Sequence, residues 1–212
     1  MKPEVVVFDL GKVLLDFDYG IAARRIAARG RLAADKVQHF IDHSPLLFRY
    51  ETGLVTREEF FNEIRAVTGF SGELEEFSGF FGDIFTPIEP MVAMQRQVRA
   101  QGIPTYVLSN TNDLAIGHIR RNFPFFANFD GYVLSYEHRA MKPDQRLYQV
   151  LETMAGTKGN RVLFLDDRKE NAEAGLTRSW QVIHHQNPAE TRSKLREMGV
   201  LATDAGGPGV LE

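Results

Sequence analysis

The chain contains no cysteine and no long apolar segment. The missing cysteine excludes disulfide bonds, a thiol nucleophile and zinc sites built on thiolates. No stretch approaches the roughly 18 apolar residues that a membrane span needs, and the apolar run at residues 5–8 is too short for the core of a secretory signal. These absences favour a cytoplasmic protein without a membrane partner.

The chain also lacks a large excess of charge of either sign. Its 25 lysines and arginines and its 28 aspartates and glutamates give a formal net charge of -3. No strongly basic field therefore argues for a nucleic acid as a partner. With 212 residues, 43% of them hydrophobic, the chain is large enough for one globular domain or for one domain that carries a smaller insert.

Apolar runs alternate with helical patterns along most of the chain. The β-branched run at 5–8 is typical of a strand that is buried on both faces. Comparable runs occur at 105–108, 131–134, 161–165 and 181–183. Helical periodicity occupies 90–101, 113–122, 143–155 and 168–176. This alternation predicts an α/β fold with a Rossmann-like parallel sheet core flanked by helices.

The alternation is interrupted between residues 17 and 85, where helical patterns dominate. Thr56 and Glu59 form a capping box in front of one of these patterns. The patterns cover 21–28, 33–43, 57–67 and 74–85. We therefore predict an inserted all-helical cap subdomain at 17–85 between two parts of the core, 1–16 and 86–200. The glycine-rich end at 201–212 is expected to be a flexible tail.

Polar residues stand at the carboxyl ends of the predicted strands. Asp9, Ser109 and Asp166 each follow or end an apolar run, and Lys142 lies a few residues beyond another. In open parallel sheets, ligands bind beyond these strand ends. The pattern therefore predicts that residues far apart in the chain meet at one rim of the sheet.

The charges expected at this rim favour a bound cation. Asp9, Asp166 and Asp167 bring three negative charges, and a phosphate dianion would add two more. Like charges ~4 Å apart repel by roughly 1 kcal/mol in water and by about 4 kcal/mol in a screened protein site. Mg²⁺ and the Lys142 ammonium would remove most of this repulsion, and carboxylate oxygens suit Mg²⁺ better than zinc. Asn171, four residues after Asp167, is expected to orient Asp167 or a metal-bound water.

The same residues predict phosphoryl transfer through an aspartate. Asp9 is the candidate nucleophile, and it would form an aspartyl-phosphate that water then cleaves. Ser109 and the amides near Asn110 would hold the phosphate oxygens, while Thr111 would either help or only cap the next helix. Lys142 would neutralise both the phosphate and the Asp9 carboxylate. We expect a small phosphorylated metabolite as the substrate and a monomer or homodimer in solution.

Four motifs in this order resemble those of the haloacid dehalogenase-like hydrolase superfamily. They are Phe8-Asp9-Leu10-Gly11-Lys12-Val13-Leu14, Ser109-Asn110, Lys142-Pro143, and Leu165-Asp166-Asp167 with Asn171. The resemblance covers about residues 4–185. It implies a Rossmann-like core, a mobile helical cap, and Mg²⁺ held by Asp9, the Gly11 carbonyl and Asp166, with Asp167 beside them. Within the superfamily the chain looks most like small sugar-phosphate phosphatases such as bacterial α-glucose-1-phosphatase.

Gly11 departs from the majority pattern of the superfamily. Most of its phosphatases have a second aspartate at that position, as the general acid and base. The loss of a general acid typically slows a reaction by about 10²–10⁴-fold. We hypothesise that the enzyme favours a leaving group that needs less protonation, such as the anomeric oxygen of a sugar 1-phosphate; equal kcat/KM for sugar 1-phosphates and alkyl phosphates would contradict this. Asp16 or Asp18 is a candidate substitute acid, although a solvated turn is the more ordinary setting for both.

Three other functions share parts of this pattern. A 2-haloacid dehalogenase uses an aspartate nucleophile and no metal, but that family places an aromatic residue where Gly11 stands here. A catalytically silent phosphate-binding module would also tolerate Gly11. A response-regulator receiver has its acidic pair before the phosphorylated aspartate, whereas Asp166 and Asp167 come last in this chain. Sensitivity to a chelator and the activity of the Asp9→Asn variant separate these alternatives.

Overall fold

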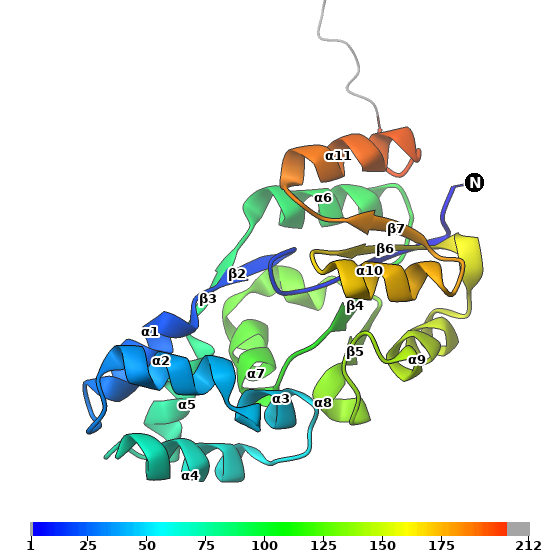
Figure 1. The fold of residues 1–212 in the computed structure, drawn as a ribbon. Coiled ribbons are helices and arrows are strands. Elements are labelled where there is room, and N and C mark those ends of the chain that lie inside the picture. The colour runs from blue at the N-terminus through cyan, green and yellow to red at the C-terminus, as the bar shows by residue number, and fades with distance from the viewer. Residues whose placement is uncertain (1, 203–212) are drawn as a thin grey trace, which may run out of the picture.

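A five-stranded parallel sheet forms the centre of the molecule (Figure 1). The computed structural model describes residues 2–202. The strands lie in the spatial order β5-β4-β1-β6-β7, and every neighbouring pair is parallel. Their bounds are β1 (Val5–Phe8), β4 (Thr105–Ser109), β5 (Gly131–Leu134), β6 (Val162–Asp166) and β7 (Gln181–His184). The predicted Rossmann-like sheet is confirmed.

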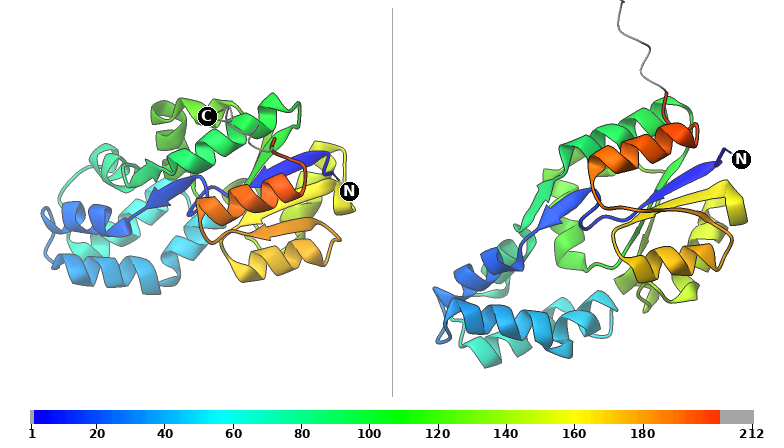
Figure 2. Two further views of the ribbon diagram at one scale, coloured as in Figure 1. Left: turned by 90° about the horizontal axis from the view of Figure 1, so that it is seen from above. Right: turned by 45° about the horizontal axis from the view of Figure 1, so that its top comes forward.

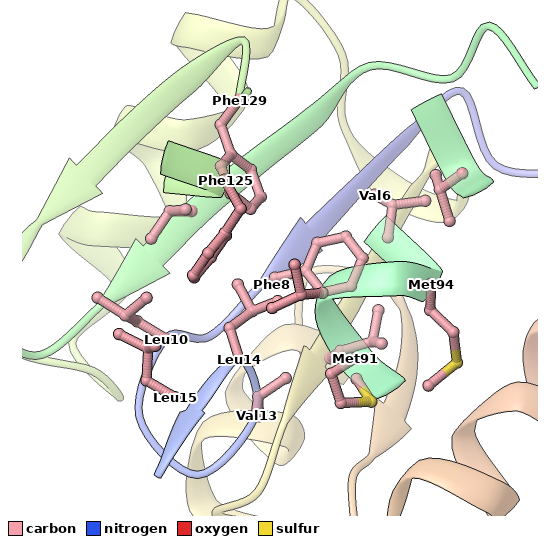
Figure 3. Close-up of a cluster of buried hydrophobic side chains, with 14 of the residues drawn as sticks. Val6, Phe8, Leu10, Val13, Leu14, Leu15, Met91, Met94, Phe125 and Phe129 are labelled. Atoms are coloured by element: carbon pink, nitrogen blue, oxygen red, sulfur yellow. The ribbon is translucent and has the colours of Figure 1, made fainter. Parts of the chain in front are cut away.

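Strand β1 is buried on both faces, as its unbroken apolar sequence indicates. Because successive side chains point to opposite faces of a strand, Val6 and Phe8 join one core cluster, whereas Val5 and Val7 join another. Figure 3 shows the first cluster, in which Met91 of helix α6 lies near Phe8. A strand that is covered on both sides belongs at the middle of a sheet.

Helices cover both faces of the sheet, with α6 and α11 on one side and α9 and α10 on the other (Figure 1). The core helices are α6 (Glu89–Ala100), α7 (Asp113–Asn122), α8 (Ser135–His138), α9 (Gln145–Ala155), α10 (Lys169–Leu176) and α11 (Pro188–Glu197). Two short 3-10 helices are η1 (Pro124–Ala127) and η2 (Gly159–Arg161). Helix α9 begins two residues after its predicted start, because Asp144 caps it by accepting from the Arg146 amide.

Five helices form a second, all-helical unit with a core of its own (Figure 2). They are α1 (Tyr19–Ala27), α2 (Ala34–His43), α3 (Pro45–Glu51), α4 (Arg57–Thr68) and α5 (Leu74–Gly82). Phe60, Phe77 and Phe81 are buried at the centre of this cap. The capping box of α4 is present, with both reciprocal hydrogen bonds between Thr56 and Glu59. Helix α3 was not predicted; Pro45 stands in its first turn and the Ser44 hydroxyl caps it.

A two-stranded antiparallel ribbon joins the cap to the core (Figure 2). It consists of β2 (Leu15–Phe17) and β3 (Phe85–Pro87). The expected helix from residue 74 to residue 85 is therefore too long: α5 ends at Gly82, and Phe85 pairs with Phe17 across the ribbon. The pairing joins residues about seventy positions apart, so no local pattern could reveal it.

Two expectations concern the ends of the chain and the membrane. Leu201, which we assigned to the tail, is buried and packs in the core cluster on the α6 side of the sheet. Residue 202 is exposed, and the part of the predicted tail from residue 203 to residue 212 lies outside the described residues. Between residues 2 and 202 there is no helix that has both the length and the apolar character to cross a membrane.

Candidate active site

The carboxyl ends of three adjacent strands bring the predicted residues together. Strand β1 lies between β4 and β6. Asp9 directly follows β1, Ser109 ends β4, and Asp166 ends β6. In a parallel sheet all these ends face the same rim. The convergence that we expected of these residues follows directly from this strand order.

Lys142 bridges two of the carboxylates. Its Nζ lies 2.9 Å from Asp9 Oδ1 and 2.6 Å from Asp166 Oδ2, and the side chains of Lys142 and Asp166 are almost completely buried. Asn110 holds the lysine backbone from both sides: its Nδ2 donates to Lys142 O at 3.0 Å, and its Oδ1 accepts from Lys142 N at 2.7 Å. A buried ion pair is stabilising only when its geometry is fixed in this way.

Burial shifts the pKa values of the charged groups. Burial raises the pKa of Asp9 to about 8; the Asp166 charge adds to the rise, and Lys142 opposes it. Burial also raises the pKa of Asp167, with Asp166 as the next contributor. For Lys142 burial acts downward, but Asp166 and Asp9 outweigh it and the pKa is raised. Three carboxylates thus share one ammonium, and the site is short of positive charge.

The carboxylates are arranged so that they could share one cation. Asp9, Asp166 and Asp167 each offer an oxygen, and these three oxygens lie within 4.8 Å of one another. The donors are all hard oxygens, which suits Mg²⁺. The excess of negative charge also fits a divalent ion, because a cation would offset the repulsion that adds to the effect of burial on the carboxylate pKa values. The residues present therefore fit a bound Mg²⁺, which these three side chains would hold. The Gly11 carbonyl as a further ligand stays a prediction.

Asn171 contacts a different carboxylate from the one that its spacing suggested. Its Nδ2 lies 3.0 Å and 3.2 Å from the two oxygens of Asp166. The first of the two expected roles, orienting Asp167, is wrong because α10 begins only at Lys169, so the two residues do not share a helix face. The other, orienting a metal-bound water, stays a prediction. The Arg168 amide also donates to Asp166, at 2.9 Å. Asp166 is thus held by three donors besides any metal.

The remaining predicted residues lie on the same rim in different settings. The Ser109 hydroxyl is buried and donates weakly to Asn110 O at 3.3 Å, and the Thr111 amide donates to Ser135 Oγ at 2.9 Å. The helix after this loop is capped by Asn112, so Thr111 is not its cap. Contact of the two hydroxyls with phosphate stays a prediction. Gly11 lines the cavity next to Asp9.

A cavity of about 210 Å³ opens beside these residues. Core residues supply one wall, and the cap with the ribbon supplies the other. The core side includes Asp9, Asn110, Lys142, Asp167 and Asn171, and also Lys12, Met141 and Arg168, to which the sequence had assigned no role. The cap and ribbon side consists of Phe17, Tyr19, Leu47 and Glu51. These four were missed because their orientation depends on how α3 and the ribbon pack.

The two candidate substitute acids do not line this cavity. Asp16 is exposed and forms an ion pair with Lys12, whose hydrogen bond lowers the Asp16 pKa. Asp18 caps helix α1 by accepting from the Gly20 amide at 2.7 Å. A carboxylate with a lowered pKa is a poor proton donor near neutral pH. Both residues are exposed, as we considered, but Asp16 lies in strand β2 rather than on a turn, and Asp18 directly precedes α1.

Comparisons with known proteins agree with this geometry. A family model described as haloacid dehalogenase-like hydrolase matches residues 3–176. The sesquiterpene phosphatase astK of Aspergillus oryzae is 22% identical over 153 residues, which is 71% of this chain and 77% of that protein. An (S)-2-haloacid dehalogenase of Pseudomonas fluorescens is 26% identical over 106 residues, or 49% of this chain and 47% of the dehalogenase.

Solved structures share the fold. A HAD family enzyme from Bacteroides thetaiotaomicron superposes with a TM-score of 0.75 at 21% identity, over 88% of this chain and 95% of that one. The same enzyme is known in complex with magnesium and inorganic phosphate. The L-2-haloacid dehalogenase of Xanthobacter autotrophicus superposes with a TM-score of 0.63 at 17% identity, over 95% of this chain and 85% of that one. The fold is thus common to enzymes that carry different names.

Proposed function

The chain belongs to the haloacid dehalogenase-like hydrolase family, and on this basis we propose that it is a Mg²⁺-dependent phosphatase of small organic phosphates, with sugar phosphates as the preferred class. The observation that carries the proposal is the cluster of Asp9, Asp166 and Asp167, whose oxygens lie within 4.8 Å of one another beside a single buried lysine. A phosphate dianion could enter such a cluster only together with a cation.

The reaction proceeds in two steps at Asp9. In the first step a carboxylate oxygen of Asp9 bonds to phosphorus, and the bond between phosphorus and the leaving oxygen breaks. In the second step water attacks phosphorus, inorganic phosphate leaves, and the Asp9 carboxylate is regenerated. Lys142 keeps Asp9 oriented and favours its ionised form, and it would contribute positive charge to the phosphate oxygens. Bound Mg²⁺ would neutralise charge on the three aspartates and on the phosphate.

Three further observations support this assignment. The cavity of about 210 Å³ is below the usual range for drug-sized ligands, which suits a small metabolite. One curated relative is named as a phosphatase, and the similar enzyme from Bacteroides thetaiotaomicron binds magnesium and inorganic phosphate. The cytoplasmic location and the monomeric or dimeric state that we expected are part of the same proposal.

The test is phosphate release from a panel of sugar, polyol and alkyl phosphates, with Mg²⁺ and with EDTA. We expect turnover that needs Mg²⁺ and that Asp9→Asn abolishes. Acid quenching during turnover should trap a phosphate label on the wild-type protein and none on the Asp9→Asn variant. Hydrolysis that persists in the Asp9→Asn variant would exclude Asp9 as the nucleophile.

A metal-independent 2-haloacid dehalogenase is the second candidate, and the identity with the Pseudomonas fluorescens enzyme favours it. The charge at the site argues against it, because a carboxylate substrate would meet Asp9, Asp166 and Asp167 with only Lys142 to balance them. Chloride release from (S)-2-chloropropionate in the presence of EDTA distinguishes the two functions. Rapid release under these conditions, with no phosphate release from the panel, would replace the phosphatase proposal.

A further inference from the structure

A carboxylate of the cap lines the active-site cavity and has no role in the mechanism described so far. Glu51 is the last residue of helix α3, and it lines the same cavity as Asp9, Lys142 and Asp167. No motif pointed to it, because α3 was not predicted. It is the one glutamate or aspartate that the cap contributes to this cavity among the described residues.

Asp166 and Asp167 are the candidate metal ligands beside Asp9, and the core has no acid at the position two residues after the nucleophile. Gly11, two residues after Asp9, stands where a general acid is expected, and the ring of Phe17 closes the space above it. A Cβ atom at residue 11 would lie 2.9 Å from Phe17 Cε1, which is closer than side-chain carbons pack. An aspartate at this position would therefore displace Phe17. The packing of Phe17 against residue 11 therefore requires a glycine at that position. The reaction still needs a group that donates and accepts a proton.

The surroundings of Glu51 favour a carboxyl that titrates near neutral pH. Burial raises the pKa of Glu51 to about 7, while the Tyr19 hydroxyl and the Arg168 charge act in the opposite direction. The Tyr19 hydroxyl donates to Glu51 Oε1 at 3.3 Å. The other charged groups of the cavity are Lys12, Arg168 and Lys142 among the cations, and Asp9 and Asp167 among the carboxylates.

The core fixes the position of Glu51 at the rim. Ser135 Oγ, at the start of α8, lies 2.5 Å from Glu51 O, and it accepts the Thr111 amide at 2.9 Å. The backbone of Glu51 is therefore tied to the loop that follows β4, the loop on which Asn110 holds Lys142. With its backbone held in this way, Glu51 keeps its place in the lining of the cavity as long as α3 contacts α8.

We propose that Glu51 is the acid–base residue of the phosphatase reaction, supplied by the cap in place of the core acid that Gly11 cannot provide. The proposal rests on the proposed phosphatase function. In the first step the Glu51 carboxyl gives its proton to the leaving oxygen as the bond from that oxygen to phosphorus breaks. In the second step the Glu51 carboxylate takes a proton from the water that attacks phosphorus, which restores its starting state.

The test compares two aryl phosphates of nearly the same shape. Phenyl phosphate has a basic leaving group that needs a proton, whereas 4-nitrophenyl phosphate has a stable one. The variant is Glu51→Gln, and the matched control is Glu63→Gln, because Glu63 is a cap glutamate that pairs with Arg49 away from the cavity. Circular dichroism and unfolding curves check the folding of each variant, and Glu51→Asp serves as a second variant.

We expect Glu51→Gln to lower kcat/KM for phenyl phosphate by about 10²-fold or more. The loss in kcat/KM for 4-nitrophenyl phosphate should be about ten times smaller than the loss for phenyl phosphate. The fall of the wild-type kcat/KM for phenyl phosphate above pH ~7 should disappear in this variant, since its side chain holds no proton to lose. The Glu63→Gln control should behave like the wild type with both substrates.

The result that would overturn the proposal is an equal loss for the two substrates, or no loss, in a folded Glu51→Gln variant. The failure of the wider function looks different. If the wild type releases no phosphate from either substrate with Mg²⁺, the phosphatase assignment and the role of Glu51 fall together. If the wild type is active, Asp9→Asn is inactive and Glu51→Gln is unimpaired, only the role of Glu51 falls.

Discussion

The ammonium of Lys142 lies 2.6 Å from Asp166, and both side chains are at most 1% exposed. An ion pair buried this deeply is costly to leave half made, because the remaining charge has no solvent around it. The pair also holds Asp166 at the rim where Asp9 and Asp167 complete the candidate metal site. Stability and metal binding are therefore coupled at these residues, and the coupling can be measured.

The first prediction concerns Lys142→Met. This substitution removes the only ammonium in contact with Asp9 and Asp166 among the described residues, and it should lower the free energy of unfolding by about 3–5 kcal/mol in EDTA. Urea denaturation measures the change. Lys36→Met is the control, since Lys36 is exposed and 3.9 Å from Asp35, and it should cost less than about 1 kcal/mol. Similar losses in the two variants would show that the buried pair is not stabilising.

The second prediction is that Mg²⁺ stabilises the folded protein. A ligand that binds only the native state at about 100 times its dissociation constant adds roughly 2.7 kcal/mol. We therefore expect Mg²⁺ to raise the melting temperature of the wild type, and to have little effect on Asp166→Asn or Asp167→Asn. Differential scanning calorimetry with Mg²⁺ or EDTA gives the answer without any substrate. A shift of the same size in all three proteins would place the bound ion elsewhere.

The third prediction tests the contact between Gly11 and Phe17. Gly11→Ala puts a Cβ atom 2.9 Å from the Phe17 ring, so the ring must move, and a loss of about 1–3 kcal/mol in unfolding free energy is expected. Adding Phe17→Leu should recover part of this loss in a double-mutant cycle. In contrast, Gly79→Ala has nothing within 4 Å of the new atom and lies inside α5, so it should stabilise the protein slightly. Additive effects at residues 11 and 17 would contradict the contact.

The fourth prediction follows from the sign of the Glu51 shift. Its pKa rises from 4.5 to about 7 on folding, so its carboxyl stabilises the fold while it is protonated below pH 4.5, and this contribution is lost as the pH rises through about 7. The side chain of the Glu51→Gln variant does not ionise, so the variant does not lose this contribution to stability as the pH rises. The variant should be more stable than the wild type at pH 8, by on the order of 2 kcal/mol, and nearly equal to it at pH 5.

Urea unfolding at the two pH values measures this difference, with Glu63→Gln as a control whose carboxylate is well exposed. A gain in stability at pH 8 together with a loss of activity would mark Glu51 as a residue kept for function at a cost to the fold. A difference of the same size at pH 5 and pH 8 would show that the carboxyl does not titrate in the folded protein as its burial requires.

The parallel strands and their carboxyl-end residues could be predicted from local patterns. Residues 5–8 form an unbroken β-branched run, and Asp9 follows it directly, so a short window of sequence contains both the strand and its polar end. The same holds for β6 and Asp166. Once the strands are parallel, geometry alone brings their ends to one rim. The candidate metal ligands could be predicted from the sequence for this reason.

The hydrogen-bond partners of individual side chains were harder to predict from the sequence. The spacing of Asp167 and Asn171 suggested a shared helix face, but α10 starts too late, and Asn171 donates to Asp166 instead. A spacing argument holds only inside a helix, and the residues that flank a helix start are the ones whose boundaries are least certain.

The wall that the cap gives to the cavity followed only from tertiary packing. The ribbon pairs Phe17 with Phe85, and Ser135 anchors the end of α3, so Glu51 reaches the cavity through contacts between segments that are 68 and 84 residues apart. Local patterns describe a strand or a helix because its hydrogen bonds join near neighbours in the chain. They cannot describe a site whose opposite wall is held by bonds between distant segments, since nothing in either segment alone encodes its partner.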